Sequence, residues 1–294
     1  MNPDFKSARD DLRKRFGSDG GCSIRPGETA SRPDATAWAC LALAQDEKAD
    51  SRVQGARDFL AAGQAEDGRI SMLAEAADVF WPTALAILAW SGSAAHGPAR
   101  QRALQFLLAV TGRHYPRRQA APAAHDTELR GWPWVGGTHS WVEPTAMAMM
   151  ALTLCGQAEH ERVHEAGRML LNRQLPDGGW NYGNTAVYGT VLHPLPQCTG
   201  VALAALAGRV ARPIVQKSIA YLQGQAARLR TPLSLAWVLL GLGAWGQRPA
   251  GASAWLRESL GRQDRYGAYD TEALSLLCLA SSATVDWLVN DPAH

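Results

Sequence analysis

The sequence has few charged residues and few cysteines. Charged residues make up 19% of its 294 residues, and the formal net charge is only +2 at neutral pH. A strong field of one sign is therefore excluded, and we expect neither nucleic acid nor an acidic membrane as the main partner. The five cysteines contain no CxxC pair, which argues against a disulfide framework and against a four-thiolate zinc site.

Long apolar runs and phosphate-binding motifs are also missing. The first ten residues, MNPDFKSARD, have no apolar core of the kind that a secretory signal needs. No uncharged apolar run reaches the roughly 18 residues of a membrane span. We therefore predict a cytoplasmic protein without a transmembrane segment, for which peripheral membrane contact stays open. Neither an aspartate-rich diphosphate motif nor a glycine-rich phosphate loop occurs, so magnesium has no recognisable ligand set.

A turn motif recurs along the chain. Its clearest copy is QLPDGGW at residues 174–180, where a helical run ends and a Pro-Asp-Gly-Gly cluster forces a turn. The pattern Gln-x-x-x-Gly-x-aromatic returns at residues 263–269, with an aliphatic end at 64–70 and in degenerate form at 16–22. Recurrence of one such unit indicates a repeat protein.

Two kinds of helix alternate between these turns. Six segments are almost wholly apolar, and a helix that is apolar all round must be buried on all sides. Six others are amphipathic, so their polar stripe must face water. The apolar segments are residues 35–44, 82–90, 144–154, 199–207, 232–242 and 271–280. The amphipathic segments are residues 6–16, 52–64, 99–110, 161–174, 213–225 and 253–263.

Both demands are met by an all-α (α/α)6 toroid, in which six helical hairpins close into an inner and an outer ring. An open solenoid, the alternative, would need polar capping repeats at its ends. No linker-like change of composition occurs, so residues 1–294 are predicted to form a single domain. One connection, residues 112–142, is far longer than ordinary loops. Its aromatic residues favour an ordered lid over a largely apolar central pocket.

With these repeats and hairpins, the chain resembles the terpenoid cyclase and protein prenyltransferase superfamily, whose squalene-cyclase members carry the QW repeat. That repeat runs from a basic and a small residue through an aromatic-aliphatic pair to Gln, Gly and Trp. Residues 59–68 keep most of it, residues 174–180 keep its second half and residues 102–107 keep its first half. The resemblance spans the whole chain and implies a toroid that holds an isoprenoid-like molecule.

In the toroids that this sequence resembles, inner helices begin at the central cavity. Aligning the apolar segments on their first small residue places six positions in register: Asp34, Trp81, Glu143, Gln197, Thr231 and Asp270. A plainer explanation is that these are N-caps, for which Asp34, Thr231 and Asp270 are well suited. Trp81, Glu143 and Gln197 are poor caps, so lining a cavity is their simplest explanation.

The resemblance to class II cyclases implies a proton donor at such a helix start. In that family the middle Asp of Asp-x-Asp-Asp-Thr-Ala protonates an alkene or epoxide, and aromatic faces stabilise the resulting carbocation. Asp34 stands at the place of the middle Asp, but Arg32 and Ala35 replace the flanking acids. The predicted catalytic residues are Asp34 or Glu143 as the donor, with Asp270 as a tuning neighbour.

Further side chains are predicted to bind the substrate, mainly as walls that stabilise a cation. They are Trp81, His139, Trp141, Trp180, Tyr182, Gln197 and Tyr269. Packing within the hairpin turns is the alternative for the aromatic rings, because buried aromatics usually belong to a core.

Zinc prenyltransferases give a second precedent, in which an Asp-x-Cys at an inner-helix start and a later His hold the metal. Cys198 lies at such a start, but residues 195–198 lack the Asp, and Glu272 or Ala273 stands where a His would be wanted. His193 or His139 would have to substitute. We therefore predict no cofactor, with Cys198 as a weak candidate for a zinc ligand.

These observations predict an isoprenoid-processing enzyme that carries out acid-initiated cyclisation of a polyprenyl-like substrate in an apolar cavity. One alternative is a carbohydrate-active (α/α)6 hydrolase or lyase, with two carboxylates drawn from Asp34, Glu143 and Asp270 and with Trp platforms for sugars. Another is a non-catalytic toroid that binds a lipid or a protein. A closed apolar pocket favours the isoprenoid, whereas an open polar cleft favours the glycan.

Overall fold

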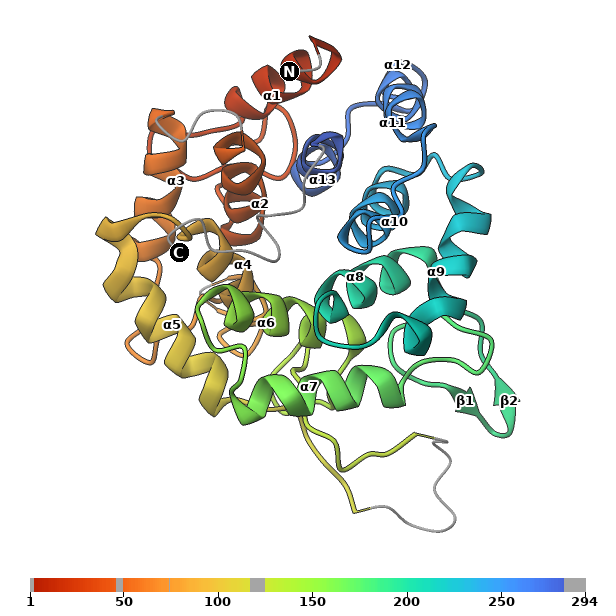
Figure 1. Ribbon diagram of the computed structural model, residues 1–294. Coiled ribbons are helices and arrows are strands. Elements are labelled where there is room, and N and C mark those ends of the chain that lie inside the picture. Colours follow the sequence, from red (N-terminus) through yellow and green to blue (C-terminus); the bar gives the residue numbers. More distant parts are fainter. Residues whose placement is uncertain (1–2, 46–49, 74, 117–124, 283–294) are drawn as a thin grey trace.

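The computed structural model describes residues 3–45, 50–73, 75–116 and 125–282. Within them, helices form two concentric rings (Figure 1). The inner ring consists of α2 (Pro33–Ala44), α4 (Pro82–Ala89), α6 (Val142–Leu154), α8 (Pro196–Leu206), α10 (Pro232–Ala244) and α13 (Thr271–Ser281). The outer ring consists of α1 (Pro3–Arg13), α3 (Ser51–Ala62), α5 (Gly97–Ala109), α7 (Glu161–Asn172), α9 (Arg212–Ala226) and α11 (Ala252–Gly261).

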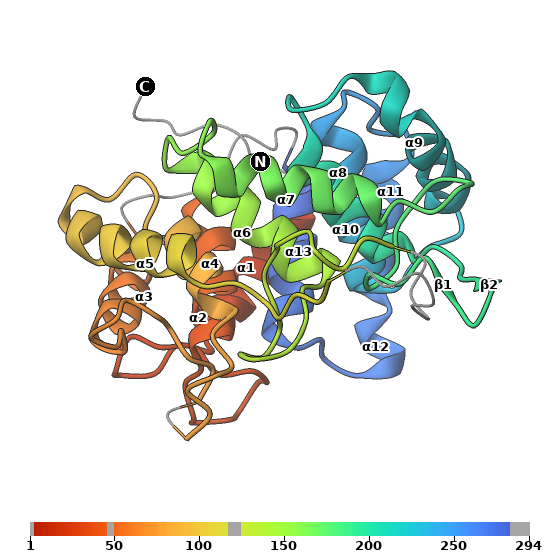
Figure 2. The ribbon, with the colours of Figure 1, turned by 90° about the horizontal axis from the view of Figure 1, so that it is seen from below.

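Short elements lie in the connections between these helices. They are the 3-10 helix η1 (Ala94–His96), the one-turn helix α12 (Gln263–Tyr266) and an antiparallel pair of strands, β1 (Ala186–Val187) and β2 (Thr190–Val191). Seen from below, α3 and α5 flank one side of the inner helices and α9 flanks the other (Figure 2). No helix among the described residues has the length and apolar character that crossing a bilayer would require.

The inner ring is closed. Each inner helix packs against the next one along the chain, and α13 packs against α2. The seam is also hydrogen bonded, since Thr271 N donates to Ile24 O over 2.8 Å and Arg15 Nη2 donates to Tyr269 O over 2.9 Å. The predicted all-α (α/α)6 toroid is therefore confirmed, and an open solenoid is excluded.

Burial follows the two helix types that the sequence contains. Every residue of α4 is buried, whereas α7 buries only one stripe, formed by Val163, Ala166, Met169 and Leu170. Each fully buried aliphatic side chain contributes roughly 1.5–3 kcal/mol relative to an exposed one. This burial favours a central position for the apolar helices. The amphipathic helices have one apolar stripe to bury and therefore lie in the outer ring.

Small residues let the inner helices approach one another closely. A Cβ atom on Gly200 of α8 would overlap the backbone carbonyl of Trp237 on α10. On the other side of the same contact, a Cβ on Gly241 would lie 2.6 Å from the Gly200 oxygen. Any larger residue at these two positions would push α8 and α10 apart.

A threonine near the start of four inner helices holds the turn that precedes it. In each case its hydroxyl accepts a hydrogen bond from a backbone N–H in that turn. The pairs are Cys22–Thr36 (2.8 Å), Ile70–Thr83 (2.9 Å), Trp132–Thr145 (3.0 Å) and Trp180–Thr199 (2.9 Å). Trp132 thus occupies the same position in its turn as Trp180 does in the QLPDGGW turn. The turn before α6 is therefore a further copy of the repeat turn, although its spacing in the sequence does not match the pattern.

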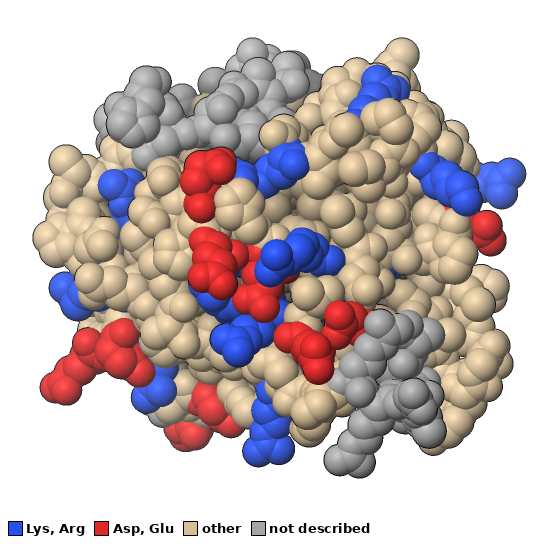
Figure 3. Space-filling model, turned by 60° about the horizontal axis from the view of Figure 1, so that its bottom comes forward, with Lys and Arg blue, Asp and Glu red and all other residues tan. Residues whose placement is uncertain are grey.

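The surface carries both signs of charge. On the face shown in Figure 3, acidic and basic side chains lie close to one another within a mostly uncharged surrounding. Ion pairs in the described part of the chain include Arg13 with Asp50 (2.9 Å) and Arg162 with Glu165 (3.2 Å). This face therefore offers no extended field of one sign to a highly charged partner.

Candidate functional site

The inner ring encloses a cavity of about 220 Å³ near the N-terminal ends of its helices. This exceeds the volume of about 150 Å³ that is known to hold a benzene molecule in an apolar protein cavity. Most of the wall is aromatic or aliphatic, and two carboxyl groups and one amide interrupt it. The lining residues are Trp38, Trp81, Leu85, Trp134, Glu143, Pro144, Met147, Gln197, Leu233 and Glu272.

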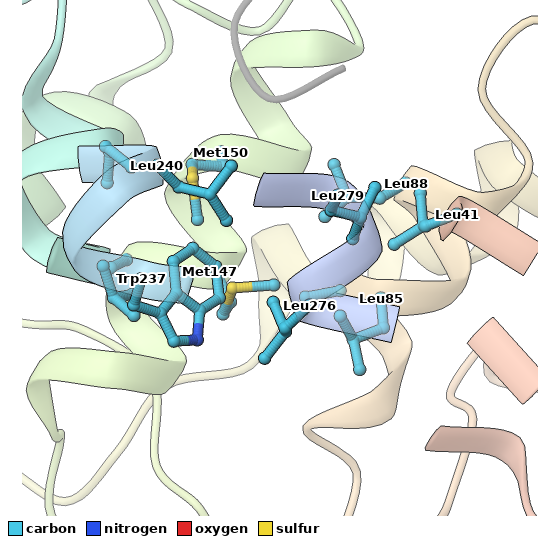
Figure 4. Packing of buried hydrophobic residues seen from close by; sticks show 14 of the residues in the cluster. Leu41, Leu85, Leu88, Met147, Met150, Trp237, Leu240, Leu276 and Leu279 are labelled. Carbon is cyan, nitrogen blue, oxygen red and sulfur yellow. The ribbon is translucent and has the colours of Figure 1, made fainter. Parts of the chain in front are cut away.

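Four of the inner helices, α4, α6, α10 and α13, each present a pair of apolar side chains toward the centre of the ring (Figure 4). Four such pairs are labelled in Figure 4: Leu85 and Leu88, Met147 and Met150, Trp237 and Leu240, and Leu276 and Leu279. In these helices the pair follows the wall residue by four and seven positions, a spacing that keeps side chains on one helix face. The floor of the cavity is therefore apolar.

Glu143 of α6 and Glu272 of α13 are the carboxyl groups of this wall. Burial raises the pKa of Glu143 to about 7, against which a hydrogen bond from Gln197 acts. Burial, followed by the negative charges of Glu143, Asp270 and Asp34, raises the pKa of Glu272 to about 8. The raised pKa of Glu272 favours its protonated form at pH 7, first through burial and then through the negative charge of Glu143.

Aromatic rings lie beside these carboxyl groups. Trp134, from the 112–142 segment, packs edge to face against Trp81, with ring centroids 5.3 Å apart and an angle of 79°. Trp38 packs in the same way against Trp237, with centroids 6.0 Å apart. The faces of such rings attract cations, most strongly where water is excluded. The cavity therefore combines a neutral acid with surfaces that stabilise positive charge.

Asp34 and Asp270, the other predicted acids, are engaged by local contacts. Arg32 Nε and Nη2 lie 2.9 Å and 2.5 Å from the two carboxylate oxygens of Asp34. Asp270 caps α13, since its carboxylate accepts a hydrogen bond from Ala273 N over 2.8 Å. In this structure one acid thus serves an ion pair and the other serves a helix cap.

The register predicted for the cavity wall differs from the structure in two helices. Leu233 and Glu272 line the cavity, whereas Thr231 and Asp270 are the N-caps of α10 and α13. The alignment fails there because the first small residue lies two positions nearer the N-cap in these helices than in α6 and α8. Of the other four predicted positions, Trp81, Glu143 and Gln197 lie in the wall, whereas Asp34 does not, and Trp38 is the residue of α2 that lines the cavity.

Two of the predicted substrate-binding rings lie in the hairpin turns. Trp180 is fully buried, and its Nε1 donates to Leu170 O over 2.6 Å. Tyr269 is partly buried, and its hydroxyl donates to Ser259 O over 2.8 Å. Both side chains therefore join a turn to the outer helix that leads into it.

The remaining predicted positions lie around α6. Tyr182 is 57% exposed, while its backbone oxygen accepts a hydrogen bond from Val142 N over 2.9 Å. Trp141 is the N-cap of α6, and its ring centroid lies 4.4 Å from that of His139. His139 lines a second cavity, which is described below. A role of these residues in substrate binding remains a prediction.

Cys198, the weak metal candidate, is buried at the start of α8. Burial, together with the charge of Glu143, raises the pKa of its thiol to about 12, so the thiolate that a metal requires is disfavoured. His193, which would have to complete a zinc site, is exposed. In the described part of the chain, no three His, Cys, Asp or Glu side chains are grouped so that they could hold a metal ion.

No protein-family model and no curated protein matches the sequence. Solved structures are similar over most of their length. The type II terpene cyclase MstE from Scytonema is 15% identical, with a TM-score of 0.64 over 95% of this chain and 97% of that one. An α-1,6-mannanase from Salegentibacter in complex with α-1,6-mannotriose is 9% identical, with a TM-score of 0.64 over 95% and 98%. A protein from Actinoplanes is 19% identical, with a TM-score of 0.61 over 90% and 82%. At these identities the likeness shows the shared toroid fold alone.

Proposed function

We propose that this protein is an acid-initiated isoprenoid cyclase in which Glu272, coupled to Glu143, supplies the proton. The observation that carries the proposal is a carboxyl group with a pKa of about 8 in a cavity lined by tryptophan and aliphatic side chains. A general acid works best when its pKa lies near the working pH, because it is then both protonated and able to release its proton.

The reaction begins with proton transfer to a carbon–carbon double bond. The alkene π electrons form the new C–H bond, which leaves a carbocation on the substrate and a carboxylate on Glu272. The faces of Trp38, Trp81 and Trp134 stabilise the cation until a second double bond attacks it and closes a ring. Loss of a proton from the final cation gives a product with the composition of the substrate, and Glu272 recovers its proton from solvent.

Glu272 is the donor because of its position next to Glu143. Glu143 has the lower pKa and gives up its proton first, and its charge then holds the proton on Glu272. Asp34 is less suitable, since both of its carboxylate oxygens are engaged by the Arg32 guanidinium and it does not line the cavity.

The cavity suggests the size of the reacting group. Its volume of about 220 Å³ is below the range of roughly 300–1,000 Å³ that is typical for drug-sized ligands. We therefore propose that it encloses the reacting end of an isoprenoid. MstE, which has the same fold, has been captured with geranylgeranyl dihydroxybenzoate as substrate and merosterolic acid A as product.

A carbohydrate hydrolase is the second candidate, because two carboxyl groups face one cavity. Glycosidases use one protonated and one ionised carboxyl group, a division that the Glu143–Glu272 pair also offers near neutral pH. The wall between them argues against it. Leu85, Met147 and Leu233 present no hydrogen-bonding groups to sugar hydroxyls, and a buried hydroxyl without a partner is costly.

Product analysis separates the two candidates. The EDTA-treated protein is incubated with prenyl diphosphates, squalene-like polyenes and α-linked mannan or glucan, and the extracts are analysed by mass spectrometry. We expect a cyclised isoprenoid that is absent with Glu272→Gln and present with Glu66→Gln, which changes an exposed acid. Shortened glycans without any cyclised product would replace this proposal with the hydrolase.

A further inference from the structure

A second cavity, of about 160 Å³, is lined by residues of the stretches 113–115, 125–129 and 139–140 together with Arg173, just after α7, and Asn184. That volume is about ten times the roughly 10–15 Å³ that one water molecule needs. Cationic and imidazole side chains from three stretches of the chain meet in its wall, and none of its lining residues is acidic. The ionisable lining groups, besides Tyr115, are Arg113, His114, His125, His139 and Arg173.

Arg173 is the most buried cation of this cavity, with only 4% of its surface exposed. Its Nη1 donates to Gly183 O over 2.7 Å, while its Nε has no hydrogen-bond partner among the described residues. Burial lowers its pKa to about 10, so the guanidinium still carries its charge at pH 7. A buried charge whose donors are only partly satisfied is unfavourable, and an anion in the cavity would relieve this.

Among the described residues, Arg173 forms no ion pair with Asp126, the acid whose charge acts on it. The negative charge of Asp126 acts on both Arg173 and His125, yet its Oδ1 accepts a hydrogen bond from Glu128 N over 2.9 Å. Asp126 does not line the cavity. The wall therefore keeps two guanidinium groups, those of Arg113 and Arg173, facing a space without a carboxylate.

The histidines add donors that an anion can use. His125 is 8% exposed, and its Nδ1 has no hydrogen-bond partner within the part of the chain that the structure describes. Burial, followed by the charge of Arg173, lowers the pKa of His125 to about 4, so the ring is neutral at pH 7. Its N–H can still donate to an anion, and a bound anion would favour its protonation.

We propose that this cavity binds a phosphate or diphosphate group. A guanidinium fork matches the oxygens of a phosphate, and charge-assisted hydrogen bonds from Arg are among the strongest in proteins. Arg173 supplies a buried fork, Arg113 supplies a second one at the exposed rim, and His125 and His139 supply imidazole donors. This proposal does not rest on the cyclase activity, because it concerns a different cavity and can be tested without turnover.

The position of His139 relates this cavity to the central one. His139 lines the second cavity and Glu143 lines the central one. Only four peptide units separate them, so their Cα atoms lie at most about 14 Å apart. Because the two cavities lie this close together, the phosphate group could belong to the ester of an apolar alcohol as well as to a free oxyanion. Both ligands are therefore tested.

Isothermal titration calorimetry of the full chain with pyrophosphate, at low salt, tests the proposal. We expect saturable binding that Arg113→Met and His125→Gln each weaken by about 10-fold or more, since a hydrogen bond to a charged group contributes about 1.5–3 kcal/mol. Arg113 is exposed, so its replacement leaves the buried packing intact even where Arg173→Met fails to fold. The matched control is Arg168→Met, which removes the same charge from the exposed side of α7 and should change the affinity less than about twofold.

Geranyl diphosphate and succinate form the other arms of the titration. Tighter binding of geranyl diphosphate than of pyrophosphate would identify a prenyl ester as the ligand, and equal binding would identify a free oxyanion; both support the site. Absence of saturable pyrophosphate binding would overturn the proposal. So would succinate binding as tightly as pyrophosphate, or Arg168→Met weakening binding as much as Arg113→Met.

Discussion

Glu143 and Glu272 stand on opposite sides of the inner ring. Going around the closed ring in either direction, α13 is the third helix after α6 (Figure 1). Both side chains nevertheless line one cavity, and the charge of Glu143 raises the pKa of Glu272. The closure of the ring thus brings together two acids that lie far apart in the sequence.

Two substitutions distinguish the acids. Glu272→Gln should lower kcat by about 10²–10⁴-fold, the usual contribution of a general acid. Asp34→Asn should retain activity within about tenfold, because Asp34 pairs with Arg32 and acts on Glu272 only through its charge. Single-turnover product formation measures both. Full activity of Glu272→Gln together with an inactive Asp34→Asn would show that Asp34, and not Glu272, is the proton donor.

The same acids predict how stability depends on pH. Their pKa values are about 7 and about 8 in the folded protein, against about 4.3 for Glu in an unfolded chain. Between about pH 4.3 and 8 the folded state therefore binds more protons than the unfolded one. The contribution of this pair to stability accordingly falls as the pH rises through that window and levels off above it.

Thermal unfolding of Glu272→Gln between pH 5 and 9 checks this sign. Glutamine stays neutral, so the variant should lose less stability toward high pH and should melt a few degrees above the wild type at pH 9. Glu66→Gln, at an exposed position, should follow the wild-type curve. A Glu272→Gln curve that parallels the wild type at every pH would show that Glu272 titrates normally.

The aromatic side chains of the cavity wall should stabilise the carbocation rather than strengthen substrate binding. Trp81→Leu removes the ring that packs against Trp134. We expect kcat to fall about 30-fold, since a desolvated cation–π contact is worth about 2 kcal/mol, with a smaller change in KM. Trp255→Leu on the outer helix α11 is the matched control and should leave kcat unchanged. A loss confined to KM would mean that Trp81 only binds the substrate.

The threonine that holds each turn should matter for stability alone. Thr199→Val leaves the buried Trp180 N–H without its acceptor. Loss of such a partner costs about 1–3 kcal/mol of unfolding free energy. Thr190→Val, at an exposed strand position, should change the unfolding free energy by less than about 0.5 kcal/mol. Equal denaturant midpoints for the two variants would show that the hydrogen bond contributes nothing.

The fold was predictable from the sequence because it depends on hydrophobicity averaged over whole helices. The apolar run 82–90 has one structural solution, burial on all sides, and the amphipathic run 161–174 has another. Six alternations of these runs leave few arrangements besides two rings. The observed helices α4 and α7 lie within a few residues of the predicted bounds.

The site was predictable only in part, since it depends on single-residue register. Glu143 and Gln197 were found because they are poor N-caps, whereas Asp270 was predicted in place of Glu272 because the first small residue of α13, on which the helices were aligned, lies two positions nearer the N-cap than in α6 and α8. The spacing from Glu272 to Leu276 and Leu279 matches that from Glu143 to Met147 and Met150. That signal was present in the sequence, but it could be recognised only once one helix face was known to point inward.

The second cavity could not be inferred from spacing at all. Arg113, His139 and Arg173 come from stretches that are separate in the sequence and meet only in the folded protein. No motif connects them in the sequence, and each alone is an ordinary polar residue.

Turnover in deuterium oxide tests the central claim most directly. If Glu272 takes its proton from solvent and gives it to the substrate, a product formed in D₂O gains one deuterium at the carbon that is protonated first. We expect this label in the wild type, with or without EDTA, and product formation that is slower by about 10²–10⁴-fold with Glu272→Gln. A cyclised product without deuterium, or one that still forms when both Glu143 and Glu272 are replaced by Gln, would contradict initiation by this acid pair.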